Sequence, residues 1–324
     1  MPIEVIKPGL STSVQDLGRP GYYHLGIPES GGMDRYALRA ANLLVGNDEG
    51  DAVLEATFQG PELRFTQDAV VAVTGAELPP KVDGTPHGTW TSFEVKPGQV
   101  LSFDFLRRGA RAYIAVAGGI DVPVVLGSRS TYALGALGGF EGRPVRVGDV
   151  LPVGTPKHAL REFRSVAEAQ RLVSSASPVL RVLPGLYDFR VTKPTLDAFF
   201  ADTWRVATEA DRIGYRFRGG RPLEFVPRTQ PFGAGSDPSN IVDSCYPYGS
   251  IQVPGGTEPI VLHRDAVSGG GYFMIGTVIS ADMDLIGQMQ PNTKVSFAPV
   301  GMDAALAARR QAAERLAALR ECLG

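Results

Sequence analysis

Val5-Ile-Lys-Pro-Gly-Leu10 near the start of the chain is answered by Arg181-Val-Leu-Pro-Gly-Leu186 in the second half. Two further pairs of phrases recur in the same order: Thr57-Phe-Gln-Gly-Pro-Glu-Leu-Arg-Phe65 with Phe217-Arg-Gly-Gly-Arg-Pro-Leu-Glu-Phe225, and Lys96-Pro-Gly-Gln-Val-Leu-Ser-Phe103 with Gln290-Pro-Asn-Thr-Lys-Val-Ser-Phe297. One such match arises easily by chance, because strand-and-turn phrases are common. Three matches in one order favour a duplicated β unit.

A duplication of this kind places two similar β domains in one chain, and clefts between domains are common ligand sites. We therefore expect a mainly β protein of two related halves, with a few short helices and a polar cleft between the halves. The length of 324 residues agrees, since single cores stop growing near about 250–300 residues. The expected ranges are 1–175 for the N-terminal half, 178–300 for the C-terminal half and 301–324 for a C-terminal helix.

Most segments have the pattern of short strands. They are rich in β-branched or aromatic residues and are bounded by glycine or proline. The 39 glycines and 25 prolines supply the turns that such strands need. Clear examples are Ala69–Thr74, Ala112–Val116 and Ile260–Leu262.

Three segments instead show helical periodicity. The first is Arg35–Val45, which Asp34 precedes as an N-cap and Gly46 ends. The second is Lys157–Val173. The third begins at Asp303, which we expect to cap it, and runs towards the end of the chain.

A polar segment of small residues, Ser174-Ser-Ala-Ser-Pro178, follows the second expected helix and is the expected linker. The apolar stretch Ala112–Gly127 is too short and too interrupted to cross a bilayer. The first ten residues lack the apolar core of a signal peptide, so we expect a cytoplasmic protein. Cys245 and Cys322 form no CxxC, and we expect two unpaired thiols that are buried or inert.

The charge balance and the absent motifs exclude several functions. With 32 basic and 34 acidic residues and no basic stripe, the chain lacks the electrostatic footprint of a nucleic-acid-binding protein. No P-loop, G-x-G-x-x-G or G-x-S-x-G motif is present. The four histidines lack metal-ligand spacing, so no metal site is expected.

Polar residues gather in a first bend of the N-terminal half. Ser13-Val-Gln-Asp-Leu-Gly-Arg-Pro-Gly21 places Gln15, Asp16 and Arg19 where glycine and proline force the chain to turn. A guanidinium, a carboxylate and an amide that converge there suit a planar amide or carboxylate ligand. The alternative is an Asp16–Arg19 pair that only pins the loop.

The second bend is Ser30-Gly-Gly-Met-Asp34, which Asn42 follows on the first expected helix. Gly31 and Gly32 permit close approach of a ligand to the backbone and a nest for an anion. The alternative is an ordinary capped helix start.

Three segments of the C-terminal half carry similar polar residues. Asp211 and Arg212 in one turn can orient a polar substrate, with Tyr215 as a hydrogen-bond donor. The run of three glycines beside Ser268 and Tyr272 indicates either a tight bend at a barrel corner or a backbone that touches a ligand. The segments are Asp211-Arg-Ile-Gly-Tyr215, Gly249-Ser-Ile-Gln-Val-Pro-Gly-Gly256 and His263-Arg-Asp-Ala-Val-Ser-Gly-Gly-Gly-Tyr272.

Taken together and in order, these loops resemble the family of biotin-dependent carboxyltransferases, also described as allophanate hydrolase subunit 2. This family includes the C subunit of 5-oxoprolinase, also called KipA, and the carboxyltransferase domain of urea carboxylase. The resemblance spans about residues 5–298. It rests on Thr12–Gly21, Gly26–Asp34, Ala41–Asn47, Leu54–Thr57, Val73–Ala76, Leu137–Arg143, Asp211–Arg216 and Gly249–Pro254.

The resemblance implies two cyclophilin-like β-barrel halves, in agreement with the internal repeat. It also implies that the chain acts with two further proteins, a B-like and an A-like subunit, and that this complex uses ATP to open the lactam of 5-oxoproline to glutamate. In urea carboxylase the related domain transfers a carboxyl group from carboxybiotin to urea. Because the Met-Lys-Met biotin attachment phrase is missing, biotin would have to arrive on a separate chain.

Both chemistries require an unreactive amide to be held and polarised, which aligned donors and one carboxylate can do. The resemblance implies that Asp211 or Asp265 accepts a proton and that Arg212 stabilises charge. The candidate catalytic residues are Asp211, Arg212, Asp265 and Tyr272. The candidate substrate-binding residues are Gln15, Asp16, Arg19, Asp34, Asn42, Gln252, Ser268 and Gly270.

The chain departs from the family pattern in one loop of the second half. The family phrase usually has the form Asp-x-Gln-Thr-Thr-Gly-Gly-Tyr, whereas this chain has Val267 in place of Gln and Ser268-Gly269 in place of the two Thr. The amide and one hydroxyl that could contact biotin or urea are therefore missing. This difference disfavours carboxyl transfer.

Three functions follow from these observations. The leading one is a component of an ATP-dependent 5-oxoprolinase complex, favoured over a urea carboxylase fragment by the missing biotin lysine and by the end of the chain soon after the repeat. The first alternative is a carboxyltransferase or allophanate hydrolase-type component in urea metabolism. The second alternative is a non-catalytic, regulatory binding partner of a kinase-inhibitor-like B subunit.

Overall fold

The computed structural model describes residues 2–158, 163–172 and 175–323, and these form two compact units. The first unit contains residues 1–19, 30–173 and 314–324, and the second contains residues 20–29 and 174–313. The predicted ranges 1–175, 178–300 and 301–324 remain a prediction. The compact units differ from them at residues 20–29 and within the last helix.

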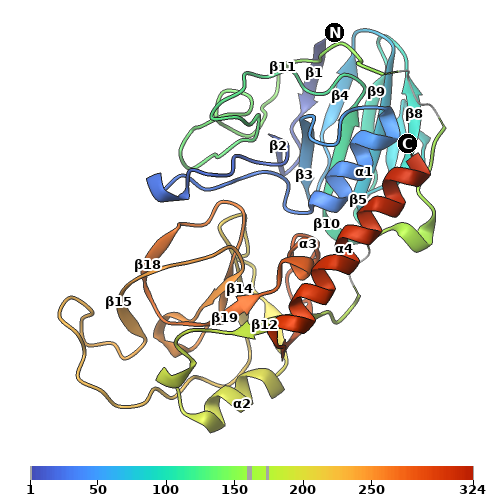
Figure 1. The fold of residues 1–324 in the computed structure, drawn as a ribbon. Coiled ribbons are helices and arrows are strands. Elements are labelled where there is room, and N and C mark those ends of the chain that lie inside the picture. The colour runs from blue at the N-terminus through green and yellow to red at the C-terminus, as the bar shows by residue number, and fades with distance from the viewer. Residues whose placement is uncertain (1, 159–162, 173–174, 324) are drawn as a thin grey trace. The chain divides into compact units, whose positions relative to one another are not determined.

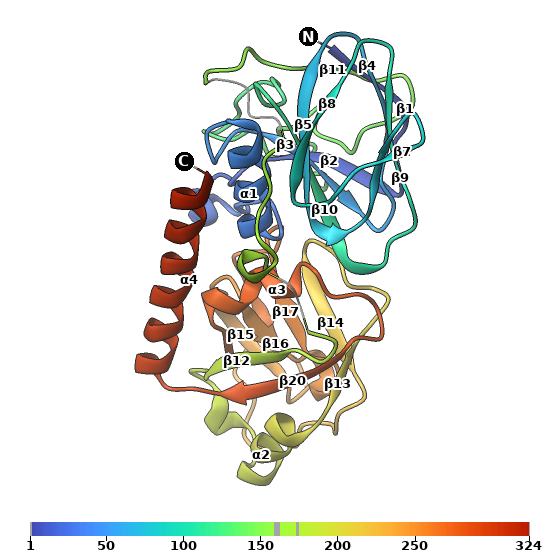
Figure 2. The same cartoon turned by 90° about the vertical axis from the view of Figure 1, so that its right-hand side faces the viewer.

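Two antiparallel sheets build the first unit, and each joins strands that are distant in sequence (Figures 1 and 2). One sheet has the order β11-β1-β4-β9-β6-β7: Val150–Pro152, Pro2–Lys7, Glu62–Phe65, Val100–Phe103, Pro80–Val82 and Thr85–Pro86. The other has the order β2-β3-β10-β5-β8: Ser11–Gln15, Val53–Thr57, Arg108–Val116, Ala69–Glu77 and Thr91–Val95.

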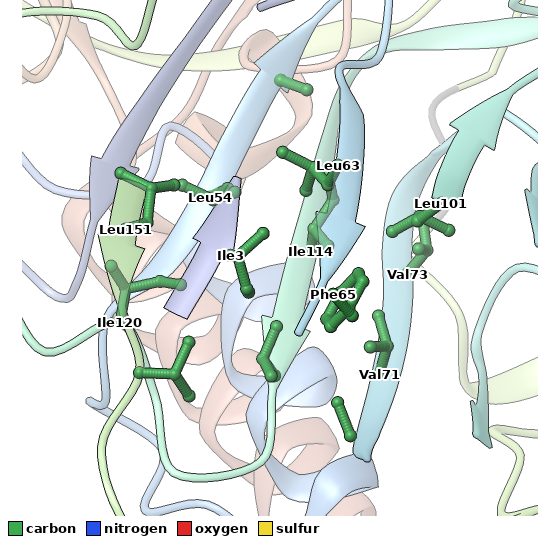
Figure 3. Packing of buried hydrophobic residues seen from close by; sticks show 14 of the residues in the cluster. Ile3, Leu54, Leu63, Phe65, Val71, Val73, Leu101, Ile114, Ile120 and Leu151 are labelled. Atoms are coloured by element: carbon green, nitrogen blue, oxygen red, sulfur yellow. The ribbon is translucent and has the colours of Figure 1, made fainter. Parts of the chain in front are cut away.

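The main core of this unit is made by side chains from both sheets. Figure 3 shows Ile3 and Phe65 of the first sheet gathered with Leu54, Val71 and Ile114 of the second. All five side chains are fully buried, and burying each apolar side chain contributes about 1.5–3 kcal/mol.

The second sheet is buried on both faces, which explains its unbroken apolar runs. On β5, Val71 and Val73 belong to the core between the sheets, whereas Val70 and Ala72 pack in a second cluster with helix α1 (Arg35–Val45). This alternation follows from the two-residue period of a strand.

Helix α1 has the predicted bounds and the predicted caps. The Asp34 carboxylate accepts a hydrogen bond from the backbone N–H of Ala37 at 2.9 Å. Gly46 ends the helix in the left-handed region, with φ of 81°, where glycine has no steric cost. This prediction is confirmed.

The last helix, α4 (Met302–Leu323), is also confirmed, but it begins one residue before Asp303. Asp303 therefore lies inside the first turn, where its negative charge interacts favourably with the helix dipole. The prediction that Asp303 is the N-cap is wrong. Leu319 and Leu323 are buried in the cluster around α1. Within the described ranges, no helix combines the length and the apolar character needed to span a bilayer.

A surface ion pair attaches the end of α4 to the loop after α1. Arg320 donates to both carboxylate oxygens of Glu49, and Arg39 Nε lies 3.5 Å from the same carboxylate. The hydrogen bonds from Arg320 lower the pKa of Glu49 below its usual range. Since the folded-state pKa is depressed, the stability that the pair contributes is present above the unfolded pKa and is lost as the pH falls through the folded value.

We predict that Glu49→Gln lowers the free energy of unfolding at pH 7 by no more than about 1 kcal/mol, because both side chains are partly exposed. The difference from the parent chain should shrink as the pH falls below the usual carboxyl range. Urea unfolding at pH 7 and in acid measures both effects. Glu314→Gln, an exposed change on the same helix, is the control. An equal difference at both pH values would contradict the assignment.

A closed seven-stranded barrel forms the body of the second unit, in the order β12-β19-β16-β17-β14-β13-β20. Figure 2 shows several of these strands around the barrel. The first and last strands of this unit, β12 and β20, pair in parallel. The bounds are Val179–Pro184, Met274–Val278, Ser250–Gln252, Ile260–Leu262, Gly214–Arg218, Trp204–Val206 and Lys294–Pro299.

Outside the barrel, a two-stranded ribbon joins β15 (Asn240–Cys245) to β18 (Gly269–Tyr272). Two further helices complete the unit, α2 (Lys193–Ala201) and the short α3 (Met283–Ile286). Helix α2 was not predicted. The expected mainly β fold with a few helices is confirmed. Of the two barrel halves that were expected, the second unit contains a closed barrel, whereas the first is built from two sheets.

Two sequence-based expectations are corrected. Residues 157–158 and 163–172 of the predicted helix Lys157–Val173 are not α-helical, and residues 159–162 and 173 lie outside the described residues. Backbone hydrogen bonds instead join Phe163 and Arg164 to Ser92 of β8. The thiols of Cys245 and Cys322 are unpaired as expected, but both are exposed rather than buried.

Candidate functional site

The Asp16 carboxylate binds a distant loop of the first unit. Its Oδ1 accepts hydrogen bonds from Gly18 N at 2.7 Å and from the hydroxyls of Ser128 and Ser130 at 2.6 and 2.5 Å, and its Oδ2 accepts one from Arg129 N. The carboxylate is nearly buried. These contacts hold the bend to residues 128–130, whereas the predicted alternative was an Asp16–Arg19 pair.

Gln15 and Arg19 bind the same loop. Gln15 Nε2 donates to Ser13 Oγ at 2.9 Å and to the Thr131 carbonyl at 3.1 Å. Arg19 Nη2 donates to the Ser130 carbonyl. Both side chains are fully buried and support the bend, and their predicted contact with a ligand stays a prediction.

The glycines of the second bend allow it to meet the first. Gly32 N donates to the Asp16 carbonyl at 3.0 Å. Gly31 has φ of +89°, and a Cβ there would lie 2.8 Å from Gly18 N and 2.9 Å from Leu17 C. The close approach is therefore between two backbone segments of the protein.

We predict that Gly31→Ala destabilises the first unit by about 1–3 kcal/mol, because backbone strain and a clash with backbone act together. Gly98→Ala is the matched control, since Gly98 has φ of +85° but no atom within 4 Å of the added Cβ. The difference in urea unfolding between the two variants measures the clash alone. Equal losses would show that the contact with the first bend has no role.

Asp34 belongs to a buried charged network that the sequence did not reveal. Its N–H donates to Tyr113 Oη at 2.7 Å, and that phenol donates to Glu55 Oε2 at 2.8 Å. Met33 N donates to the same Glu55 oxygen, and Arg111 Nε lies 3.8 Å from the other. Burial, and then the negative charges of Glu55 and Asp34, raise the pKa of Tyr113 well above its ordinary value, so the phenol stays a donor.

Asn42 organises the loop that follows helix α1. Its Nδ2 donates to the carbonyls of Glu49 and Asp51 at 3.2 and 2.8 Å, and its Oδ1 accepts from Asn47 Nδ2. These bonds use the amide for a turn inside the protein. Asn42 thus supports this turn, and its predicted contact with a substrate stays a prediction.

A cavity of about 180 Å³ opens beside this loop and is lined by Asp51, Asp121, Arg129, Lys157 and glycine backbone. Lys157 Nζ lies 3.0 Å from Asp51, and Arg129 Nη2 lies 3.1 Å from Asp121. Both lining cations are thus paired within the wall, which leaves little charge to attract a ligand.

In the second unit, Arg212 and Asp265 form a two-point ion pair. Arg212 Nε lies 2.8 Å from Asp265 Oδ2, and Nη2 lies 3.3 Å from Oδ1. Asp265 N also donates to the Arg212 carbonyl at 2.9 Å. The carboxylate is buried and the guanidinium is partly exposed, so Asp265 orients Arg212 towards solvent-accessible space.

Asp211 is adjacent in sequence but differs in environment. Its side chain is exposed, and Oδ1 accepts hydrogen bonds from Ile213 N at 2.8 Å and Gly214 N at 3.0 Å. This is the geometry of an Asx turn, which shapes the bend that carries Arg212.

Four other predicted residues meet around Tyr246, which sequence reasoning missed. Tyr246 Oη accepts from Tyr272 N at 2.7 Å and donates to the Tyr272 carbonyl at 2.8 Å. Tyr246 N donates to the Ser268 carbonyl, and the Gln252 side chain is close enough to the phenol to lower its pKa. A Cβ on Gly270 would lie 3.1 Å from the Tyr246 ring, so the glycine run accommodates this ring. Burial raises the pKa of Tyr246.

Arg264 is a second residue that sequence reasoning missed. Its side chain is 5% exposed, and the guanidinium lies 4.2 Å above the Tyr248 ring. The nearest carboxylate contacts are 3.7 Å to Glu29 and 3.8 Å to Asp284, beyond hydrogen-bond distance. The sequence offered one indication of Arg264, which is that it directly precedes the candidate residue Asp265.

One loop, residues 263–268, therefore carries Arg264, Asp265 and Ser268 and connects β17 to the ribbon strand β18. At the position where the family pattern has Gln, the Val267 side chain is 54% exposed. Tyr272 at the end of β18 is 46% exposed. We take this loop, with Arg212, as the candidate site, and whether it faces the first unit stays a prediction.

The chain was compared with known protein families, proteins and solved structures. Residues 25–299 match the family described as carboxyltransferase domain, subdomain A and B. The C subunit of the 5-oxoprolinase of Escherichia coli (strain K12) is 36% identical over 308 residues, covering 95% of this chain and 94% of that protein. The urea amidolyase of Saccharomyces cerevisiae is 35% identical over 317 residues, but the chain spans only 17% of its length.

The fold agrees with these relatives. The crystal structure of the K. lactis urea amidolyase superposes with a TM-score of 0.92 at 33% identity, covering 98% of this chain and 20% of that one. A match over most of the chain, together with identity above 30% along nearly all of a relative, identifies a family. This chain therefore belongs to the carboxyltransferase domain family, subdomain A and B.

Proposed function

We propose that this chain is the C subunit of an ATP-dependent 5-oxoprolinase, which opens the cyclic amide of 5-oxoproline to glutamate. The observation that carries this proposal is the 36% identity to a 5-oxoprolinase C subunit along 95% of this chain and 94% of that protein. The chain would act with two partner proteins, a B-like and an A-like subunit. ATP would be used by the complex, since the chain contains no P-loop.

The candidate site supplies chemistry that suits a lactam carrying a carboxylate. Arg212, oriented by Asp265, presents a planar guanidinium that matches a carboxylate or stabilises a developing oxyanion. Opening the ring adds water to the amide: a C–O bond forms at the carbonyl carbon, the C–N bond breaks, and the nitrogen gains a proton. Asp211 is exposed and is our candidate for proton exchange at that nitrogen, and the partly exposed Tyr272 is a further candidate catalytic residue.

Reconstitution tests the proposal. The chain is co-expressed with the A-like and B-like proteins, and glutamate release from 5-oxoproline is measured with and without ATP. We expect ATP-dependent glutamate release that disappears when this chain is omitted from the complex. Glutamate release that does not need ATP, no release from the complete complex, or release that continues when this chain is omitted would overturn the assignment.

A second candidate function is carboxyl transfer to urea, which the family description and the 98% coverage by the urea amidolyase structure support. Biotin would then be carried on a separate chain. Discharge of carboxybiotin upon addition of urea would identify this function. A rate equal to that in buffer alone would eliminate it.

A further inference from the structure

Arg190, at the end of the 3-10 helix Asp188–Arg190 of the second unit, is a nearly buried cation. Its exposed fraction is 4%. Nη2 donates to the Pro238 carbonyl at 2.8 Å, but Nε and Nη1 are buried and have no hydrogen-bond partner. Among the described residues, no carboxylate forms an ion pair with it.

A single segment, residues 226–240, which we call the strap, contacts Arg190 at both of its ends. Val226 N donates to the Arg190 carbonyl at 2.8 Å, and the Pro238 carbonyl accepts from its side chain. Apart from the first residue of β15, the strap contains no helix or strand, and most of its residues are exposed. Apart from the buried Ala234 and Ser239, few packed side chains therefore oppose its movement.

A second arginine lies on the strap itself. Arg228 Nη2 donates to the Asn240 carbonyl at 3.2 Å, so the two guanidinium groups bind carbonyls only two residues apart. Burial, and then the charge of Arg228, lower the pKa of Arg190. The two cations thus repel each other across a short stretch of backbone.

A buried charge without a counterion is strongly unfavourable, and buried N–H groups without partners are rare in folded proteins. A small anion would supply both the charge and the acceptors that are missing here. We propose that Arg190 and Arg228 form a binding site for a small oxyanion, a carboxylate or a phosphate, beneath the strap. The planar fork of arginine is the group that best recognises either anion.

This site is connected to the two-stranded ribbon of β15 and β18. Asn240 pairs with Tyr272 in the register of β15 and β18, and Phe273 N donates to the Ser239 carbonyl. An anion that orders the strap therefore orders the strand end that carries Tyr272. The site differs from the loop 263–268 and does not depend on the proposed enzyme activity.

The test is hydrogen exchange of residues 226–240 in the complete chain, with sodium chloride at matched ionic strength as the reference. Inorganic phosphate and glutarate are added in separate arms, which distinguishes a phosphate site from a carboxylate site. We expect one of these anions to slow exchange in the strap and to raise the unfolding temperature. Arg190→Met should abolish both effects and should be at least as stable as the parent chain in chloride alone.

Two further variants complete the design. Arg205→Met removes an exposed arginine of the same unit and should leave the anion effect unchanged. Arg228→Met removes the exposed partner, so it should fold normally and weaken anion binding by about tenfold. The proposal would be overturned if neither anion slowed hydrogen exchange in the strap and if Arg190→Met were less stable than the parent chain in every buffer. That result would show that Arg190 only holds the strap in place.

Discussion

Arg212→Lys should lower the kcat/KM of glutamate release from 5-oxoproline by on the order of 10²-fold, with little change in stability. Lysine keeps the positive charge but cannot form the two-point pair that Asp265 makes with Arg212 Nε and Nη2. The substituted ammonium would therefore lose its fixed orientation. Steady-state kinetics of the complete complex measure this effect.

A matched variant separates a site effect from a general effect of losing an arginine pair. Arg221 forms a comparable pair with Asp202 in the same unit, with Nη2 2.6 Å from Oδ1, but none of the predicted site residues takes part in it. Arg221→Lys should leave kcat/KM within about twofold of the parent value. Similar losses in both variants would remove Arg212 from the site.

The second large effect concerns stability. Glu55→Gln should destabilise the first unit by about 3–5 kcal/mol, because it removes a buried negative charge that lies 3.8 Å from the buried Arg111 guanidinium. Glutamine keeps the size of the side chain and can still accept from Met33 N and Tyr113, so the change isolates the charge. Urea unfolding at neutral pH measures the loss.

The control for this variant is Glu77→Gln on the same sheet. Glu77 pairs with Arg108 at 3.8 Å, but both side chains are well exposed. Removing a charge there should cost less than about 1 kcal/mol. Comparable losses at the two positions would show that burial of the Glu55 network contributes nothing.

Local signals predicted local structure well. Helix α1 was predicted to the residue because Asp34 and Gly46 cap it through contacts within one turn. The strand Ile260–Leu262 was equally clear. The apolar runs of β5 and β10 were recognised because both faces of their sheet are buried.

Predictions failed where a distant segment decides the backbone. Residues around Phe163 have helical periodicity, but backbone hydrogen bonds to Ser92 of β8 fix the path of Phe163 and Arg164, and Phe163 has φ of 55°. Pairing with a strand edge thus overrides the local preference. No sequence pattern near residues 157–173 indicates that the edge of β8 is available for pairing with this segment.

The residues of the candidate site were likewise predicted in part and missed in part. The resemblance pointed to Arg212 and Asp265, and the fold brings them into contact although 53 positions separate them. Tyr246 and Arg264 were missed, because their roles depend on the rings and backbone that surround them. Conversely, the side chains of Asp16 and Asn42 could bind a polar ligand, but they form hydrogen bonds with loops of the protein.

The central claim is that Arg212 and Asp265 act as one unit in an amide-opening site. A double-mutant cycle of Arg212→Lys and Asp265→Asn on kcat/KM in the reconstituted complex tests it most directly. We predict that the double variant is no slower than Arg212→Lys alone, since either change already breaks the pair. Multiplicative losses, or a parent-like rate in all three variants, would contradict the account.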